Sequence, residues 1–141
     1  AMLIASEEGV NMHKLNPLAR IITSAVVGVE PRIMGMGPVQ ASNKALEKAD
    51  LKMDNIDLIE INESFSAQSL ACIRQWGLDD NDPRINPNGG AIALGHPLGM
   101  SGTRILQTAS IELQKQNKQY ALATMCVGVG QGYAVIIENI K

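Results

Sequence analysis

Short segments rich in valine and isoleucine alternate along the chain with segments whose apolar residues recur at helical spacing. Segments of the first kind are candidate strands, at residues 2–6, 19–29, 56–61, 120–125 and 132–137. Candidate helices lie between them, at residues 42–49, 64–76 and 101–116. In the second of these, the apolar spacing predicts an inward face made of Phe65, Ala67, Leu70, Ala71 and Ile73. Strands that alternate with helices predict a layered α/β domain, with the helices on the faces of one five-stranded sheet.

The last two candidate strands constrain this sheet further, because only residues 126–131 separate them. A parallel connection needs a crossover of about a dozen residues or more. The final strand is therefore expected to run antiparallel to its neighbour, which makes the sheet mixed. The length of 141 residues is that of one domain, so residues 1–141 are expected to share one core.

Composition and charge exclude several classes of protein. Hydrophobic residues make up 45% of the chain and charged residues 18%, which is typical of a soluble globular protein. A net charge of −2 and an aromatic content of 3% argue against a nucleic-acid partner. The chain has no basic leader and no apolar run of about 18 residues, so neither secretion nor a membrane span is expected.

The cysteine count also bears on the setting of the protein. Two cysteines, Cys72 and Cys126, cannot form a disulfide framework or a four-ligand zinc site. A cytoplasmic protein without a bound metal is therefore expected. Cys72 lies in the candidate helix 64–76 and is interpreted as a small core residue.

Charge is scarce around the candidate helix 101–116. Between Ile85 and Ile111 the only charged residue is Arg104, although the segment includes most of that helix. A helix with so few charges is expected to be covered on several sides. A single domain of this size cannot cover it fully, so part of the cover is expected from outside this chain.

Asn62 opens the first of three blocks that carry chemistry, Asn62-Glu63-Ser64-Phe65, where the strand 56–61 meets the helix 64–76. Asparagine is a favoured N-cap residue, so capping is one interpretation of Asn62. The same position lies beyond the carboxyl end of a strand, where ligands of open α/β sheets gather. The two roles are compatible.

His96 stands in a second block, between Gly95 and Pro97, in a glycine-rich segment that holds almost no charge. A lone histidine is more often structural than catalytic. Here, however, a rigid backbone directs the ring, and a neutral imidazole can act as a base or donate to a developing oxyanion.

Cys126 opens the third block, Cys126-Val127-Gly128-Val129-Gly130, directly after the strand 120–125. A strand rather than a helix follows this block, so it is not a dinucleotide-binding fingerprint. Glycines at a strand end permit close approach of a substrate and leave N–H groups available to an oxyanion.

Together, these three blocks resemble the C-terminal signature blocks of the thiolase family. The resemblance covers the whole chain and implies that residues 1–141 form the C-terminal half of a thiolase, without the N-terminal half, its nucleophilic cysteine and the loop domain. Ser64 and Ser66 stand where alanine is common. The related ketosynthases have a different glycine–phenylalanine loop where this chain has Cys126.

The resemblance implies an acyltransferase that uses coenzyme A as a co-substrate and holds no bound cofactor. By the same resemblance, His96 activates the absent nucleophile and donates to the thioester oxygen, and Asn62 holds a water of the first oxyanion hole. Cys126 would be the second acid/base, the Gly128 N–H would line the second oxyanion hole, and Phe65 would border the pantetheine channel.

Residues 82–102 are most similar to the β-ketoadipyl-CoA thiolase branch, which implies cleavage of β-ketoadipyl-CoA to succinyl-CoA and acetyl-CoA. The implied partners are an acyl-CoA, the N-terminal half, and further copies in a homodimer or homotetramer. This chain alone is expected to be inactive, because it lacks the nucleophilic cysteine. The alternative is a non-catalytic half-domain that binds coenzyme A or mediates oligomerisation.

Overall fold

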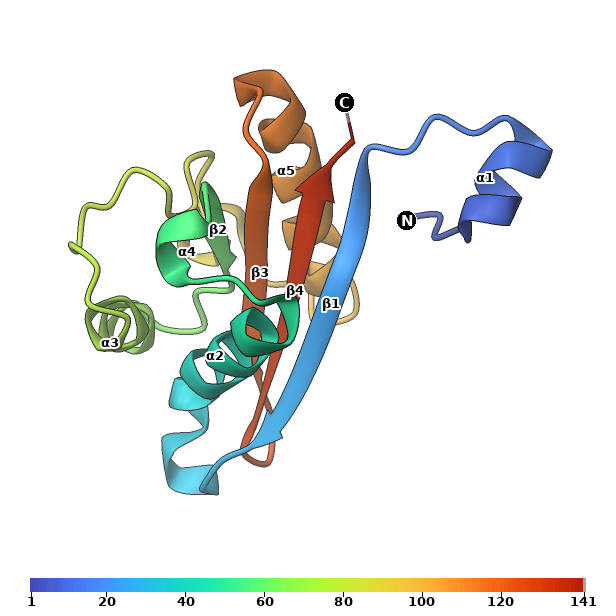
Figure 1. Ribbon diagram of the computed structural model, residues 1–141. Coiled ribbons are helices and arrows are strands. Elements are labelled where there is room, and N and C mark those ends of the chain that lie inside the picture. Colours follow the sequence, from blue (N-terminus) through green and yellow to red (C-terminus); the bar gives the residue numbers. More distant parts are fainter. Residues whose placement is uncertain (141) are drawn as a thin grey trace.

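A computed structural model describes residues 1–140 of the chain as four strands with helices on both faces (Figure 1). The strands are β1 (Ala19–Gly28), β2 (Leu58–Ile61), β3 (Tyr120–Val127) and β4 (Gln131–Asn139). The α-helices are α1 (Glu7–His13), α2 (Gly37–Ala49), α3 (Ser66–Gln75), α4 (Ala91–Leu94) and α5 (Ser101–Gln116), and two 3₁₀ turns lie at Pro31–Met36 and Met53–Asn55. No helix within residues 1–140 is long and apolar enough to cross a membrane.

The strands form one mixed sheet in the order β1-β4-β3-β2. Strand β4 pairs antiparallel with both β1 and β3, whereas β2 pairs parallel with β3. The predicted α/β class, the mixed sheet and the antiparallel last strand are therefore confirmed. Because β2 and β3 are parallel, their carboxyl ends lie at the same edge of the sheet.

The predicted strand at residues 2–6 is wrong, and the sheet has four strands rather than five. These residues hold no regular secondary structure, and Ser6 instead caps α1 by accepting from the Gly9 N–H. Leu3 and Ile4 expose 77% and 70% of their surface. A strand needs a neighbouring strand to complete its backbone hydrogen bonds, and residues 2–6 pair with no strand of the described chain.

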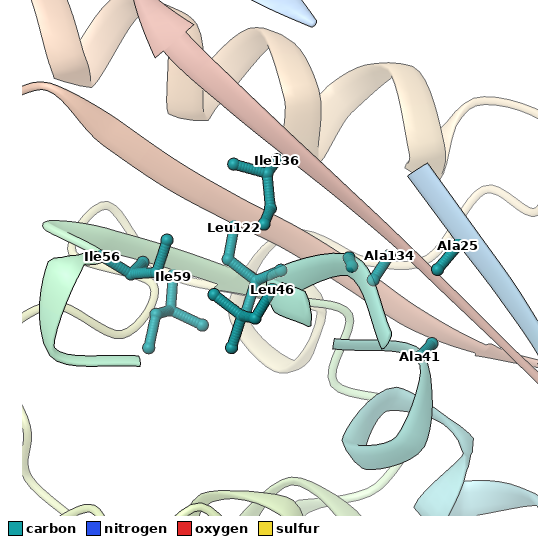
Figure 2. Packing of buried hydrophobic residues seen from close by; sticks show 9 residues of the cluster. Ala25, Ala41, Leu46, Ile56, Ile59, Leu122, Ala134 and Ile136 are labelled. Atoms are coloured by element: carbon teal, nitrogen blue, oxygen red, sulfur yellow. The ribbon is translucent and has the colours of Figure 1, made fainter. Parts of the chain in front are cut away.

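The core lies on both faces of the sheet. Figure 2 shows one cluster, in which Leu46 of α2 packs against Ile59, Leu122 and Ile136 of the strands. On the other face, Leu113 of α5 belongs to a second cluster, together with Leu58, Ala109, Ala121, Val135 and Ile137. Figure 1 shows α2 and α5 on opposite sides of the sheet. The molecule therefore has a helix–sheet–helix layering.

Strand β2 is buried on both faces. Successive side chains of a strand point to opposite sides, so Ile59 and Ile61 face α2 and α3 while Leu58 and Glu60 face α5. The outer edge of β2 is also covered, because its Ile59 forms a parallel bridge with Ile85. This burial holds the end of β2, and the residues that follow it, in one place.

Helix α5 has the bounds predicted from its periodicity, whereas α3 begins two residues later than predicted. The predicted inward face of α3 is also partly wrong. Phe65, Ala67 and Ala71 are exposed, and the buried residues of the helix are Ser69, Cys72 and Ile73. The predicted core position of Cys72 is confirmed, since it exposes none of its surface.

Candidate acid–base site at the carboxyl edge of the sheet

Asn62, Ser64 and Cys126 form a hydrogen-bonded group at the carboxyl ends of β2 and β3. The Ser64 Oγ lies 3.1 Å from the Cys126 Sγ, and the Asn62 Nδ2 donates to the same Ser64 Oγ over 3.3 Å. Asn62 is fully buried and Cys126 exposes 7% of its surface. A thiol, a hydroxyl and an amide are thus held together in a largely dry position.

The parallel register of β2 and β3 brings these residues together. Ile61 pairs with Thr124, and the Asn62 N–H continues the ladder by donating to the Thr124 carbonyl over 2.9 Å. Cys126 follows two residues after Thr124 on β3. The chain then turns after Asn62, which brings the Ser64 hydroxyl back to the end of β3.

The interpretation of Asn62 as a helix N-cap is wrong. Helix α3 begins at Ser66, and the residue before it, Phe65, is extended and makes no side-chain cap bond. The Asn62 amide instead bonds Ser64, and its Oδ1 is buried with no hydrogen-bond partner among residues 1–140. A buried acceptor without a partner is costly, so this atom is suited to a water or a ligand group.

Glu63 joins this group to the loop that leads to His96. One Glu63 carboxylate oxygen accepts from the Asn86 Nδ2 and the other from the Ile92 N–H, both over 2.9 Å. Gly90 leaves room for this carboxylate, because a Cβ at that position would lie 2.3 Å from the Glu63 carboxyl carbon, which would then have to move. The sequence alone indicates no role for Glu63 or Asn86. Its one local sign that a side chain approaches the backbone here is the glycine pair Gly89-Gly90.

Asn86 also completes the edge of β2. Its Oδ1 accepts from the Ile61 N–H and its Nδ2 donates to the Ile61 carbonyl, each over 2.9 Å, as a neighbouring strand would do. Asn86 adopts a left-handed backbone with φ of 43°, which asparagine tolerates better than most residues. The amide therefore fixes the residue that directly precedes Asn62.

His96 lies in an exposed loop between α4 and α5, and its Nδ1 is 2.7 Å from the Ser101 Oγ. The Ser101 hydroxyl donates its hydrogen to the Pro97 carbonyl, which can only accept. Ser101 must then accept from the Nδ1–H of His96. A neutral ring held in this way has its lone pair on Nε2, which suits a general base.

The structure places the remaining predicted residues on the rim of the site. Phe65 is 71% exposed, and Gly128 lies in the exposed turn between β3 and β4 with open space beside its Cα. No hydrogen bond within residues 1–140 links His96 to Asn62 or Cys126. The candidates therefore divide into a buried group around Cys126 and an exposed loop around His96.

Two further titratable groups lie in the core near the site. Burial raises the pKa of the Cys72 thiol to about 11, although the Gln68 Nε2 donates to its sulfur. Burial also raises the pKa of Glu60 to about 7, and the Arg104 guanidinium only partly opposes this effect. With a pKa of about 11, Cys72 stays a neutral thiol near neutral pH and is not suited to act as a nucleophile.

The family of the chain follows from its match over most of its length. Residues 15–139 match the family described as the C-terminal domain of thiolase. The chain belongs to the thiolase family. The resemblance carried by the blocks around Asn62, His96 and Cys126 is therefore confirmed at the level of the family.

Two bacterial thiolases align with 99% of this thiolase domain. It is 55% identical to the 3-oxoadipyl-CoA/3-oxo-5,6-dehydrosuberyl-CoA thiolase of Escherichia coli (strain K12) and 56% identical to the β-ketoadipyl-CoA thiolase of Acinetobacter baylyi. Each alignment runs over 140 residues and includes 35% of the relative. The chain thus spans 35% of the length of these curated relatives.

A solved structure supports the same assignment of the fold. The crystal structure of human mitochondrial 3-ketoacyl-CoA thiolase in complex with CoA is similar to this thiolase domain with a TM-score of 0.93 and 49% sequence identity. The match covers 97% of this chain and 34% of that chain. The four-stranded layered domain is therefore a thiolase C-terminal fold.

Proposed function

We propose that this chain, as one domain of residues 1–141, is the C-terminal catalytic half of an acyltransferase. The complete enzyme would cleave a 3-oxoacyl-CoA with coenzyme A, or run the reverse Claisen condensation. The hydrogen-bonded group of Asn62, Ser64 and Cys126 carries the proposal, because it holds a thiol beside a buried amide whose oxygen has no partner among residues 1–140. Such a group suits proton transfer better than simple binding.

His96 would serve the first half of the reaction. Its free Nε2 takes the proton of a cysteine thiol from the N-terminal half, and the resulting thiolate attacks the 3-oxo carbon of the substrate. The protonated imidazole then donates to the developing oxyanion, with a water held by Asn62 as the second donor. The carbon–carbon bond breaks, which leaves an acyl-enzyme and the enolate of acetyl-CoA.

Cys126 would serve the enolate. Its thiol gives a proton to the enolate carbon, and the Gly128 N–H stabilises the enolate oxygen during this step. The Cys126 thiolate then takes the proton of the coenzyme A thiol, and the resulting thiolate attacks the acyl-enzyme. The shortened acyl-CoA leaves, and the released cysteine thiolate of the N-terminal half regains its proton from His96. Phe65, exposed at the rim, would border the channel for the pantetheine arm of the substrate.

The favoured substrate is β-ketoadipyl-CoA, which would give succinyl-CoA and acetyl-CoA. The support is the similarity of residues 82–102 to that branch and the printed names of the two bacterial relatives, whose identity to this chain is 55–56%. Coenzyme A acts as a co-substrate, and the proposal requires no bound cofactor or metal. The complete protein would be a cytoplasmic homodimer or homotetramer.

Two variants of the complete protein test the separate roles proposed for His96 and Cys126. His96→Ala should suppress acylation of the nucleophile, whereas Cys126→Ala should leave acylation by acetyl-CoA detectable and abolish condensation. Each loss should be roughly 10²- to 10⁴-fold, the usual range for a positioned acid or base. Acyl-enzyme is measured by intact-protein mass spectrometry, and equal loss of acylation in both variants would contradict the assignment.

The substrate is tested separately, by kcat/KM. The value for β-ketoadipyl-CoA should exceed that for acetoacetyl-CoA. The reverse order would refute the branch assignment and leave the family assignment intact. If the complete protein binds CoA thioesters, seen as a thermal shift, but turns none over, it is a binding module rather than an enzyme.

A further inference from the structure

Ser64 is the side chain in hydrogen-bond contact with the Cys126 sulfur within residues 1–140. It stands where the resemblance to thiolases leads one to expect alanine, which has no polar atom to offer. The Ser64 hydroxyl is half-buried and lies 3.1 Å from the Sγ. The contact is therefore a feature of this chain that the three signature blocks do not explain.

The direction of the hydrogen bonds follows from the groups involved. The Asn62 Nδ2 can only donate, and it does so to the Ser64 Oγ over 3.3 Å. This bond uses one lone pair of the hydroxyl and leaves its hydrogen and its second lone pair available. Ser64 can therefore donate to the thiolate of Cys126 and accept from its thiol.

The titratable groups near Cys126 do not replace Ser64 as the hydrogen-bond partner of its sulfur within residues 1–140. Cys72 is held neutral by burial, which raises its pKa to about 11. The carboxylate of Glu63 is directed at Asn86 and at a main-chain N–H instead. A charge on the Cys126 sulfur would thus be met first by the Ser64 hydroxyl.

We propose that Ser64 is a positioning residue that fixes the Cys126 sulfur at the end of β3 and favours its thiolate over its thiol. The inference rests on the proposed function, in which Cys126 passes through both forms in every turnover. A hydrogen bond to an ionised acceptor is about twice as strong as one to a neutral acceptor. The bond from Ser64 therefore stabilises the thiolate more than the bond to Ser64 stabilises the thiol.

The first test uses the complete protein and does not depend on its activity. The rate at which iodoacetamide modifies Cys126 is measured against pH by mass spectrometry of the Cys126 peptide. In Ser64→Ala, the midpoint of this profile should move up by about one pH unit, which corresponds to a tenfold smaller thiolate fraction. Ser64→Thr keeps the hydroxyl and should restore the original midpoint.

Ser66→Ala is the matched control, because Ser66 is an exposed serine two residues away and makes no side-chain hydrogen bond within residues 1–140. Its midpoint should equal that of the unchanged protein. An unmoved midpoint in Ser64→Ala, or an equal shift in Ser64→Ala and Ser64→Thr, overturns the proposal.

The second test separates this inference from the proposed function. Ser64→Ala should lower kcat for condensation roughly tenfold at neutral pH, and Ser64→Thr should restore it. If Cys126→Ala condenses normally, the proposed function fails, whatever the alkylation profile of Ser64→Ala shows. If Cys126→Ala is inactive but Ser64→Ala keeps the original kcat and midpoint, the role of Ser64 alone fails.

Discussion

Glu60 offers a sharp test of the electrostatics at this sheet, through the substitution Glu60→Gln. Its side chain lies between β2 and α5, fully buried, and neither carboxylate oxygen has a hydrogen-bond partner within residues 1–140. Burial raises its pKa from 4.5 to about 7; Arg104 opposes the shift, while Glu63 and Glu112 add to it. The folded state therefore favours the protonated acid.

The sign and size of the effect on stability follow from linkage. Because the folded-state pKa is raised, the stabilising contribution is complete below pH 4.5 and is lost as the pH rises through about 7. A difference of about 2.5 units, at 1.36 kcal/mol per unit, gives about 3 kcal/mol. Glutamine has the shape of the protonated acid and does not titrate, so Glu60→Gln should not incur this loss.

The assay is urea denaturation of the 141-residue chain at pH 5 and pH 8, followed by the fluorescence of Trp76, which packs against the core. Glu60→Gln and the unchanged chain should have similar free energies of unfolding at pH 5. At pH 8 the variant should be more stable by about 2–3 kcal/mol. Glu47→Gln is the control, because Glu47 is an exposed residue of α2 and its substitution should have no such pH dependence.

The outcome that would refute this reasoning is an equal difference between variant and unchanged chain at both pH values. A second variant strengthens the test, because Arg104→Met removes the one positive charge that opposes the shift. It should raise the pKa of Glu60 further and increase the loss of stability between pH 5 and pH 8.

Three further predictions concern the same chain. Gly90→Ala should destabilise it by about 1–3 kcal/mol in urea, because the new Cβ would meet the Glu63 carboxyl carbon at 2.3 Å; unchanged stability would contradict this packing. Cys72 should resist iodoacetamide at pH 8 until urea unfolds the chain, since burial raises its pKa to about 11; rapid labelling of native protein would refute its burial. The isolated chain should show no thiolase turnover, because it lacks the nucleophilic cysteine, and measurable turnover would disprove this. It should also self-associate in light scattering, because Leu98 and Phe65 expose 82% and 71% of their surface; a monodisperse monomer would disprove this second claim.

The features that the sequence predicted correctly depend on local signals. The bounds of α5 follow from helical periodicity alone, and the antiparallel β3–β4 pair follows from the short connection between the strands. The core position of Cys72 likewise follows from its place in a helical pattern. Each signal is contained within a few turns or residues of the chain.

The wrong predictions needed information from distant residues. Residues 2–6 have the composition of a strand, but a strand forms only where a partner completes its ladder. Phe65 was assigned to the inward face of a helix, yet it precedes α3 in an extended conformation and is exposed. Local composition does not predict the missing strand or the exposed Phe65, because both depend on contacts with distant parts of the chain.

The candidate site shows the same limit. Ser64 and Cys126 meet only because β2 and β3 pair in parallel, since the two positions are 62 apart in the sequence. The bond from Asn86 to Glu63 spans 23 residues and depends on an amide that substitutes for a strand edge. Ser101 was missed for another reason, since a serine at the start of a helix suggests a cap rather than a partner for His96.

The group around Cys126 is buried, whereas the loop around His96 is exposed, and this difference affects the proposed mechanism. Cys126 and Asn62 are held by strand pairing and are almost wholly buried, so their positions are fixed by residues of this chain. His96 is exposed, and its neighbour Leu98 presents 82% of an apolar side chain to solvent. A base works best where water is excluded, because electrostatic interactions strengthen as the local dielectric falls. In the proposed enzyme, the surface that brings the nucleophile to His96 Nε2 must therefore also cover this loop, so one contact would supply both the thiol and the dry environment.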